Sequence, residues 1–284
     1  MHLESMCMSK ILFMRNGALG DVILTTGIIR EFCKINNCKV DVQTGCPDVF
    51  KNNPNVENIV FNPNHSSYEK VFDLNWVSER SGDKHSMDAF SEFVFGYRNT
   101  NVTPELFALE SDEVLDVPSP YIVMHLRRHH GISRNLPEKF YIEVMKGILS
   151  NTNMNIVVIG ATSDIRVNGD RIIDMVDKLS LQQSYCLIKN AKCFVGADSA
   201  PIHIAACTQT PLLAFFTQSH HERREAKYRN AKHISVGANI ECYGCLEKYY
   251  VPPFGPYDCH RGDGECVNRF DSQSVTKQVL ELIS

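Results

Sequence analysis

Short apolar runs recur along this chain, and each is followed by turn residues and then by apolar positions at helical spacing. Residues 10–15 form the first run, a turn with two glycines occupies residues 16–21, and residues 22–35 have the spacing of a helix. The same order restarts at residues 121–126 and continues through a second buried run at residues 154–159. This succession of strand, turn and helix predicts an α/β fold with parallel sheets.

A proline-rich break divides the chain into two such successions. Two prolines in Asp116-Val-Pro-Ser-Pro120 disfavour any regular element there. The length of 284 residues also suits about two domains of roughly 100–200 residues each. We therefore expect two doubly wound domains, residues 1–117 and residues 118–284, facing a cleft. Because ligands of open α/β sheets bind beyond the carboxyl ends of the strands, function is expected in the turns that follow strands.

The overall charge and hydropathy exclude several classes of protein. A formal net charge of -4 gives no basic field for nucleic acid. No run approaches the roughly 18 apolar residues that a membrane-spanning helix needs, and residues 1–10 lack the apolar stretch of a secretory signal. These features predict a cytoplasmic protein, in which thiols stay reduced.

The turn after the first strand is the first candidate site. Gly17 and Gly20 allow the backbone to approach a ligand closely, and the following helix begins with its positive dipole end. The spacing matches neither the dinucleotide fingerprint nor the phosphate-binding loop of nucleotide triphosphatases. Asp21 stands at the mouth of the helix, either as a simple helix cap or as a carboxylate aimed into the cleft as a general base.

A second candidate turn follows a short strand that ends near residue 196. Backbone N–H groups of Ser199 and Ala200 precede a helix that opens with proline, and they are suited to a phosphate. Asp198 is placed to accept a hydrogen bond from a sugar hydroxyl, and His203 lies inside the helix. The alternative is an ordinary capped helix with a core histidine.

Together these two turns carry a family resemblance. The stretch Gly17-Ala-Leu-Gly-Asp21 resembles the opening motif of the heptosyltransferase family, glycosyltransferase family 9. The stretch Gly196-Ala-Asp-Ser-Ala-Pro-Ile-His203 resembles the second signature of the same family. The resemblance extends in order along nearly the whole chain. It implies the GT-B fold, in which two Rossmann-like doubly wound domains face a cleft, with the acceptor on the N-terminal domain and a nucleotide sugar on the C-terminal one.

The resemblance also implies roles for these residues in an inverting sugar transfer that needs no metal for catalysis. Asp21 matches the general base that deprotonates the acceptor hydroxyl. Asp198 matches the acidic residue that contacts the donor sugar, and the backbones of Ser199 and Ala200 match the groups that bind the diphosphate. His203 lies on the same helix and is expected to brace the loop.

A basic stretch after residue 126 is similar to the segment that carries the family's phosphate-binding lysine. Arg134 stands at the lysine position, and arginine keeps the charge and binds phosphate in a bidentate manner. Arg127 belongs to the same local cluster of basic side chains, for which a solvated charged face is the alternative. Asp164 lies near an acidic position of the family that contacts the nucleotide or sugar. The family's glycine before the helix proline is replaced here by Ala200.

The expected function is therefore the transfer of a heptose-like sugar from a nucleotide-sugar donor, with ADP-heptose favoured, to a hydroxyl of a lipopolysaccharide or other glycan. The acceptor is a glycan, a lipid-linked glycan or a protein, and a lipid-linked one implies peripheral contact with the inner membrane face. Two alternatives remain open: a degenerate nucleotide-sugar-binding protein without turnover, and an epimerase with a GT-B-like fold.

Eleven cysteines are the unusual part of the composition, and four of them are clustered in residues 242–266. The set suits a tetrahedral structural zinc site, because four thiolates fill its coordination sphere; its members are Cys242, Cys245, Cys259 and Cys266. Family members often have a similar cysteine-rich segment, and some protein-modifying relatives bind iron with it, so iron is also open. Free or paired thiols are the alternative. The remaining seven cysteines are expected to pack as small apolar side chains.

Overall fold

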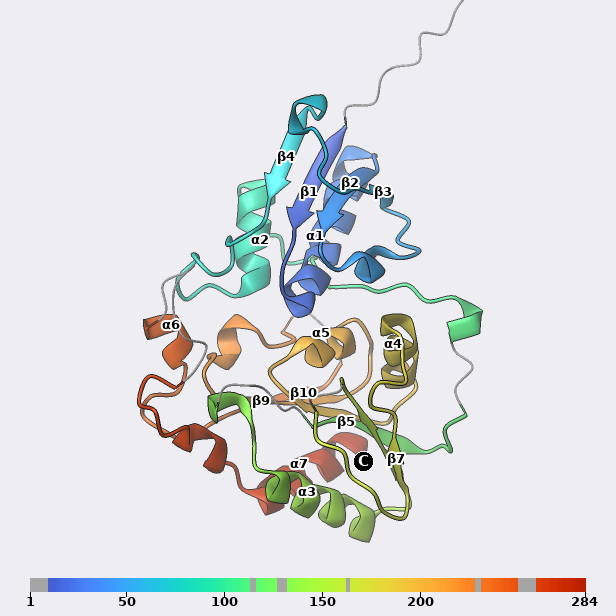
Figure 1. The fold of residues 1–284 in the computed structure, drawn as a ribbon, viewed down its shortest axis with the longest axis vertical. Helices are drawn as coiled ribbons and strands as arrows, with labels where there is room; N and C mark the ends of the chain where they lie inside the picture. The colour runs from blue at the N-terminus through green and yellow to red at the C-terminus, as the bar shows by residue number, and fades with distance from the viewer. Residues whose placement is uncertain (1–9, 113–115, 127–131, 162–163, 228–230, 250–258) are drawn as a thin grey trace, which may run out of the picture.

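The apolar runs of the sequence form the strands of two parallel sheets in a computed structural model of the chain (Figure 1). The structure describes residues 10–112, 116–126, 132–161, 164–227, 231–249 and 259–284. Within these residues, no helix is long and apolar enough to cross a membrane.

The first sheet has four strands in the order β3-β2-β1-β4, and every pair is parallel. The strands are β1 (Ile11–Arg15), β2 (Val40–Thr44), β3 (Val56–Ile59) and β4 (Lys70–Asp73). Helix α1 (Leu19–Asn36) follows β1, and helix α2 (Ser86–Phe95) packs against α1. Residues 20–29 of α1 are all buried, including Thr25, Thr26 and Gly27, which interrupt the apolar positions of this stretch.

The second sheet has six strands in the order β10-β9-β8-β5-β6-β7, again all parallel. Its strands are β5 (Tyr121–His125), β6 (Asn155–Ile159), β7 (Ile172–Asp174), β8 (Phe194–Ala197), β9 (Leu212–Phe216) and β10 (His233–Gly237). Its helices are α3 (Glu138–Asn151), α4 (Leu181–Lys189), α5 (Ala200–Ala206), α6 (Cys245–Tyr249) and α7 (Ser272–Ile283). The α/β fold expected from the sequence is confirmed.

Alternate strand residues face opposite sides of the second sheet. Ile122 and Ile156 lie in a core with α3 and α7 on the outer face, below the sheet in Figure 1. Val123 and Val157 face the other way, toward α4 and α5. That second cluster continues without a break into the core of the first half, because α1 packs directly on α5.

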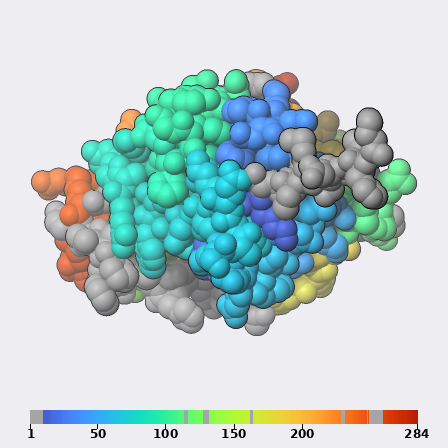
Figure 2. All heavy atoms as spheres, turned by 90° about the horizontal axis from the view of Figure 1, so that it is seen from above, coloured from blue at the N-terminus to red at the C-terminus, as the bar shows by residue number. Residues whose placement is uncertain are grey.

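The two halves therefore share one apolar core across their boundary. Seen from above, the first half covers most of the visible face, and parts of the second half emerge around its rim (Figure 2). The boundary between residues 117 and 118 remains a prediction, although the two sheets draw on residues 11–73 and residues 121–237.

Candidate active site at the boundary of the two halves

Asp21 is the third residue of α1 and is almost completely buried. The helix is preceded by Ala18, whose φ of 53° lies in the left-handed region, and no side chain caps the helix. The alternative that Asp21 merely caps the helix is therefore wrong. Its side chain is 6% exposed and points to charged partners instead.

Two arginines hold the two oxygens of the Asp21 carboxylate. Arg15, at the end of β1, places Nη2 2.9 Å from Oδ2. Arg224, from the second half of the chain, places Nη1 3.2 Å from Oδ1. The carboxylate thus lies where both halves of the protein reach it, although Arg15 and Arg224 were not singled out from the sequence.

Arg15 is itself fixed by three further hydrogen bonds. Its guanidinium donates to the Leu74 carbonyl at 3.1 Å and to Glu79 at 2.6 and 3.2 Å. Burial acts to lower the pKa of Arg15, but Glu79 and Asp21 outweigh it and raise that pKa above its ordinary value. Arg15 therefore stays charged and forms a rigid bridge between Asp21 and the segment after β4.

The second motif lies at the carboxyl end of β8. Asp198, Ser199 and Ala200 are all partly exposed, at the start of α5. The Ser199 hydroxyl donates to the Ala197 carbonyl at 2.9 Å and lies 3.1 Å from Nδ1 of His125. It makes no capping bond to α5, so the first N–H groups of that helix are not satisfied by this side chain.

His125 links the ends of three neighbouring strands. It is the last residue of β5, and its Nε2 lies 3.0 Å from Oδ2 of Asp164, which follows β6. The same Asp164 oxygen accepts from the Ala161 N–H at 2.8 Å. Ser199, which follows β8, completes a series of three interacting side chains, Ser199–His125–Asp164. The series lies at the carboxyl ends of β8, β5 and β6, where a donor is expected to bind. His125 was missed in the sequence, where only its place at the end of a strand signalled a role.

The two sequence motifs meet at Gly20 and His203. A Cβ atom on Gly20 would stand 2.5 Å from Cδ2 of His203 and 3.5 Å from Cα of Ala200. The glycine therefore allows α1 to approach α5 closely, across the boundary of the halves. Gly17, in contrast, has open space around the position of a Cβ, so a ligand has room to approach its backbone.

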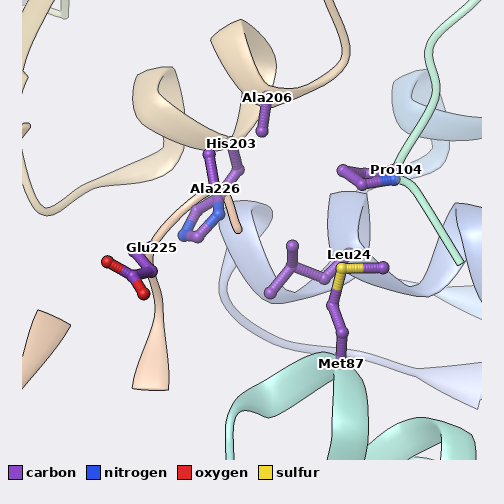
Figure 3. A pocket seen from close by; sticks show the side chains of 7 residues that line it. All are labelled: Leu24, Met87, Pro104, His203, Ala206, Glu225 and Ala226. Atoms are coloured by element: carbon purple, nitrogen blue, oxygen red, sulfur yellow. The ribbon is translucent and has the colours of Figure 1, made fainter. Parts of the chain in front are cut away.

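His203 is a buried neutral side chain between the two candidate carboxylates. Burial lowers its pKa, and the opposing charges of Asp198 and Asp21 do not restore it. A small cavity beside His203 is lined by Leu24 and Met87 from the first half and by Glu225 from the second (Figure 3). This environment suits a brace between the halves better than a proton-transfer group.

Arg134 lies near the same edge of the second sheet. It stands at the end of a short 3₁₀ segment, and its Nε donates to Oε1 of Gln218 at 2.6 Å. Gln218 follows β9 and belongs to the segment that delivers Arg224 to Asp21. Arg127, the other basic residue expected to bind phosphate, lies outside the described residues.

The four clustered cysteines come close to one another without forming a compact ligand set. Burial first, and then the nearby thiols of Cys259, Cys245 and Cys242, raise the pKa of the Cys266 thiol to about 12. Cys266 donates to the Ser133 carbonyl at 3.6 Å, and Cys259 to Asp263 at 3.7 Å. Across the described parts of the chain, no group of three or more histidine, cysteine or acidic side chains is arranged to hold a metal ion.

The architecture defines a class of protein: two facing parallel α/β halves with a site at their boundary form the GT-B fold of glycosyltransferases. Several solved structures share it. A glycosyltransferase family 9 protein from Veillonella parvula aligns with a TM-score of 0.73 and 13% identity, over 97% of both chains. ADP-heptose lipopolysaccharide heptosyltransferase II from Escherichia coli aligns with a TM-score of 0.72 and 15% identity, over 96% of this chain and 98% of that one.

A family model described as glycosyltransferase family 9 (heptosyltransferase) matches residues 85–251, and the chain belongs to this family. A third similar structure is the iron-containing dodecameric heptosyltransferase TibC of enterotoxigenic E. coli, in complex with ADP-D-β-D-heptose. It aligns with a TM-score of 0.73 and 13% identity, over 96% of this chain and 76% of that one. A search of curated proteins found no match. The family and the fold expected from the sequence are confirmed, and the protein is a glycosyltransferase.

Proposed function

We propose that the protein transfers a heptose-like sugar from a nucleoside diphosphate to a hydroxyl group, with inversion at the anomeric carbon. The observation that carries the proposal is the meeting of the two motifs: Gly20 touches His203, so Asp21 and Asp198 flank one boundary. ADP-heptose is the favoured donor, because TibC was solved in complex with it. A lipopolysaccharide or other glycan is the favoured acceptor, and a protein is the second.

In this mechanism Asp21 accepts the proton of the acceptor hydroxyl as its oxygen attacks the anomeric carbon. The bond from that carbon to the diphosphate oxygen breaks, and its electron pair leaves with the diphosphate. Asp198 binds a sugar hydroxyl, and the backbone N–H groups of Ser199 and Ala200 stabilise the charge of the leaving group. Arg134 and Arg127 add positive charge for the phosphates. The same proposal locates the enzyme in the cytoplasm, where a lipid-linked acceptor is reached at the inner membrane face.

A thermal-shift screen with ADP-, GDP-, UDP- and CMP-sugars tests the donor class. A ligand present at 100 times its dissociation constant stabilises the folded state by about 2.7 kcal/mol, so the true donor class is expected to raise the melting temperature clearly. Asp198→Asn is expected to weaken that stabilisation. If none of the four classes shifts the melting temperature, the proposed donor is wrong.

We further propose that the four clustered cysteines bind one structural metal ion, zinc or iron. The proposal is supported by the effect of the other three thiols on the pKa of Cys266 and by the iron content of TibC. Elemental analysis of the purified protein is expected to find about one ion per chain, and Cys242→Ser is expected to lose it. Cys46→Ser, outside the cluster, is the matched control and is expected to retain the ion. A folded, metal-free wild type would contradict this proposal.

A further inference from the structure

Residues 217–227, which follow β9, form a segment that we call the strap. It leaves the second sheet and crosses to the first half of the protein, where three of its side chains and one of its carbonyls make contacts. Arg224 reaches Asp21, with Nη1 3.2 Å from Oδ1. No position of the two family motifs lies in the strap, and the assigned roles leave its basic residues unused.

The strap also holds the segment that carries Glu79. Arg223 is 6% exposed and donates to the carbonyls of Ser78 at 2.7 Å and Lys84 at 3.4 Å. Glu79 lies between these two anchor points and forms the ion pair with Arg15, which in turn holds the second oxygen of Asp21. The strap therefore acts on Asp21 twice: directly through Arg224, and through the backbone that supports Glu79.

Two more contacts fix the strap to helix α2. Lys227 pairs with Asp88 at 3.0 Å, and Nε2 of His85 lies 2.9 Å from the carbonyl oxygen of Glu225. Asp88 and His85 belong to the first turn of α2 and to the residue before it. The strap is thus attached at several points, and its attachment does not depend on the ion pair with Asp21.

The root of the strap is fixed on the donor side of the boundary. Gln218 accepts from Arg134 at 2.6 Å through its side chain and from the Leu246 N–H at 2.9 Å through its carbonyl. The Tyr243 hydroxyl lies 2.8 Å from both N and Nδ1 of His221. A continuous set of contacts therefore runs from Arg134, the expected phosphate ligand, through the strap to Asp21.

We propose that Arg224 is a positioning residue, which aligns the Asp21 carboxylate for the acceptor hydroxyl only while the strap is docked on the first half. The proposal rests on the proposed function, because it assigns Asp21 the part of the base. The two oxygens of Asp21 are held by arginines from different halves of the protein. The orientation of this carboxylate therefore depends on how the strap is docked on the first half. A misplacement of about 1 Å in such a group lowers turnover about 100-fold.

Steady-state kinetics of Arg224→Gln test the positioning role. Glutamine removes the charge but keeps a hydrogen-bond donor, so kcat is expected to fall about 10- to 100-fold. The dissociation constant of the donor is expected to stay within about twofold, because Arg224 contacts Asp21 rather than the donor turn. Arg224→Lys is expected to recover part of kcat.

The matched control is Arg166→Gln, which removes another arginine paired with two aspartates, at 3.1 and 2.8 Å, on the far edge of the second sheet. Its kcat is expected to equal that of the wild type. An unchanged kcat in Arg224→Gln, or an equal loss in Arg166→Gln, would overturn the positioning role.

Hydrogen exchange tests the docking of the strap without any donor or acceptor. Lys227→Gln removes one attachment to α2, and it is expected to speed amide exchange in residues 75–88 several-fold relative to the wild type and Arg166→Gln. If the wild type transfers no sugar, the proposed function is wrong. The docking of the strap is then still tested by amide exchange in residues 75–88. If Lys227→Gln leaves exchange in residues 75–88 unchanged, the strap does not hold that segment and the inference is wrong.

Discussion

Single charged and polar side chains at the boundary determine how this protein is assembled. Asp21 is held by one arginine from each half. His85 also has a partner in each half: its Nδ1 accepts from the Met87 N–H in α2, and its Nε2 lies near the carbonyl oxygen of Glu225. Both residues are nearly inaccessible to water. At this scale, the contacts that shape the site are the same contacts that join the halves.

His85 makes the stability of the protein depend on pH. Burial lowers its pKa to about 3, and Nδ1 accepts the Met87 N–H only in the neutral ring. The unfolded chain binds a proton below its ordinary pKa of about 6.5, whereas the folded protein does not until about pH 3. The contribution of His85 to the free energy of unfolding is therefore expected to fall by about 1.4 kcal/mol for each pH unit between about pH 6 and about pH 3.

Urea unfolding at pH 7 and pH 5 measures this loss. His85→Gln is expected to be less stable at pH 7 but to show a smaller difference between the two pH values. The exposed His65→Gln is the control and is expected to behave like the wild type. An identical pH dependence in His85→Gln and the wild type would refute the assignment.

Helices α1 and α5 pack against each other across the boundary of the two halves. Their close contact depends on Gly20, which has no side chain. Gly20→Ala would bring a Cβ to 2.5 Å from the His203 ring. Because α1 and α5 lie in the shared core, we expect a loss of about 1–3 kcal/mol in the free energy of unfolding. Gly17→Ala meets no atom within 4 Å and is expected to change stability by less than about 0.5 kcal/mol.

Thermal melting of the two alanine variants measures the difference directly. Gly20→Ala is expected to melt several degrees below Gly17→Ala. Equal melting temperatures would show that the approach of α1 to α5 is not tight.

Most elements were predictable because their local pattern and their tertiary environment agree. The apolar runs at residues 10–15, 121–126 and 154–159 form β1, β5 and β6, and the short strand that ends near residue 196 is β8. Strands β7 and β10 were not predicted, because their residues are only partly buried and do not form a strong apolar run.

The positions of the motif residues in the fold were also predictable, whereas the side chains that support them were not. Asp21 lies in the first turn of the helix that follows β1, Asp198 and Ser199 lie between β8 and α5, and all three were singled out by their place in the sequence motifs. Arg15, Glu79 and Arg224 have no common pattern, since two of their contacts join residues 64 and 203 positions apart in sequence. Only the folded chain brings them to one carboxylate.

At the scale of the whole molecule, two α/β halves share a core, and the candidate site lies at their boundary. One apolar cluster contains residues of both, and the strap adds polar contacts across the same boundary. This arrangement agrees with the family to which the chain belongs, whose model spans residues 85–251 and so crosses from one half to the other. It also explains why a donor bound on the second half is expected to react with an acceptor deprotonated from the first.

The most direct test compares sugar transfer and donor hydrolysis by the wild type and Asp21→Asn, with the donor identified by the thermal-shift screen. Asparagine preserves the shape of the side chain but cannot accept the proton, so the rate is expected to fall about 10²- to 10⁴-fold. The dissociation constant of the donor is expected to remain that of the wild type. Full activity in Asp21→Asn would contradict the account, because the carboxylate at the boundary of the two halves would then not be the base.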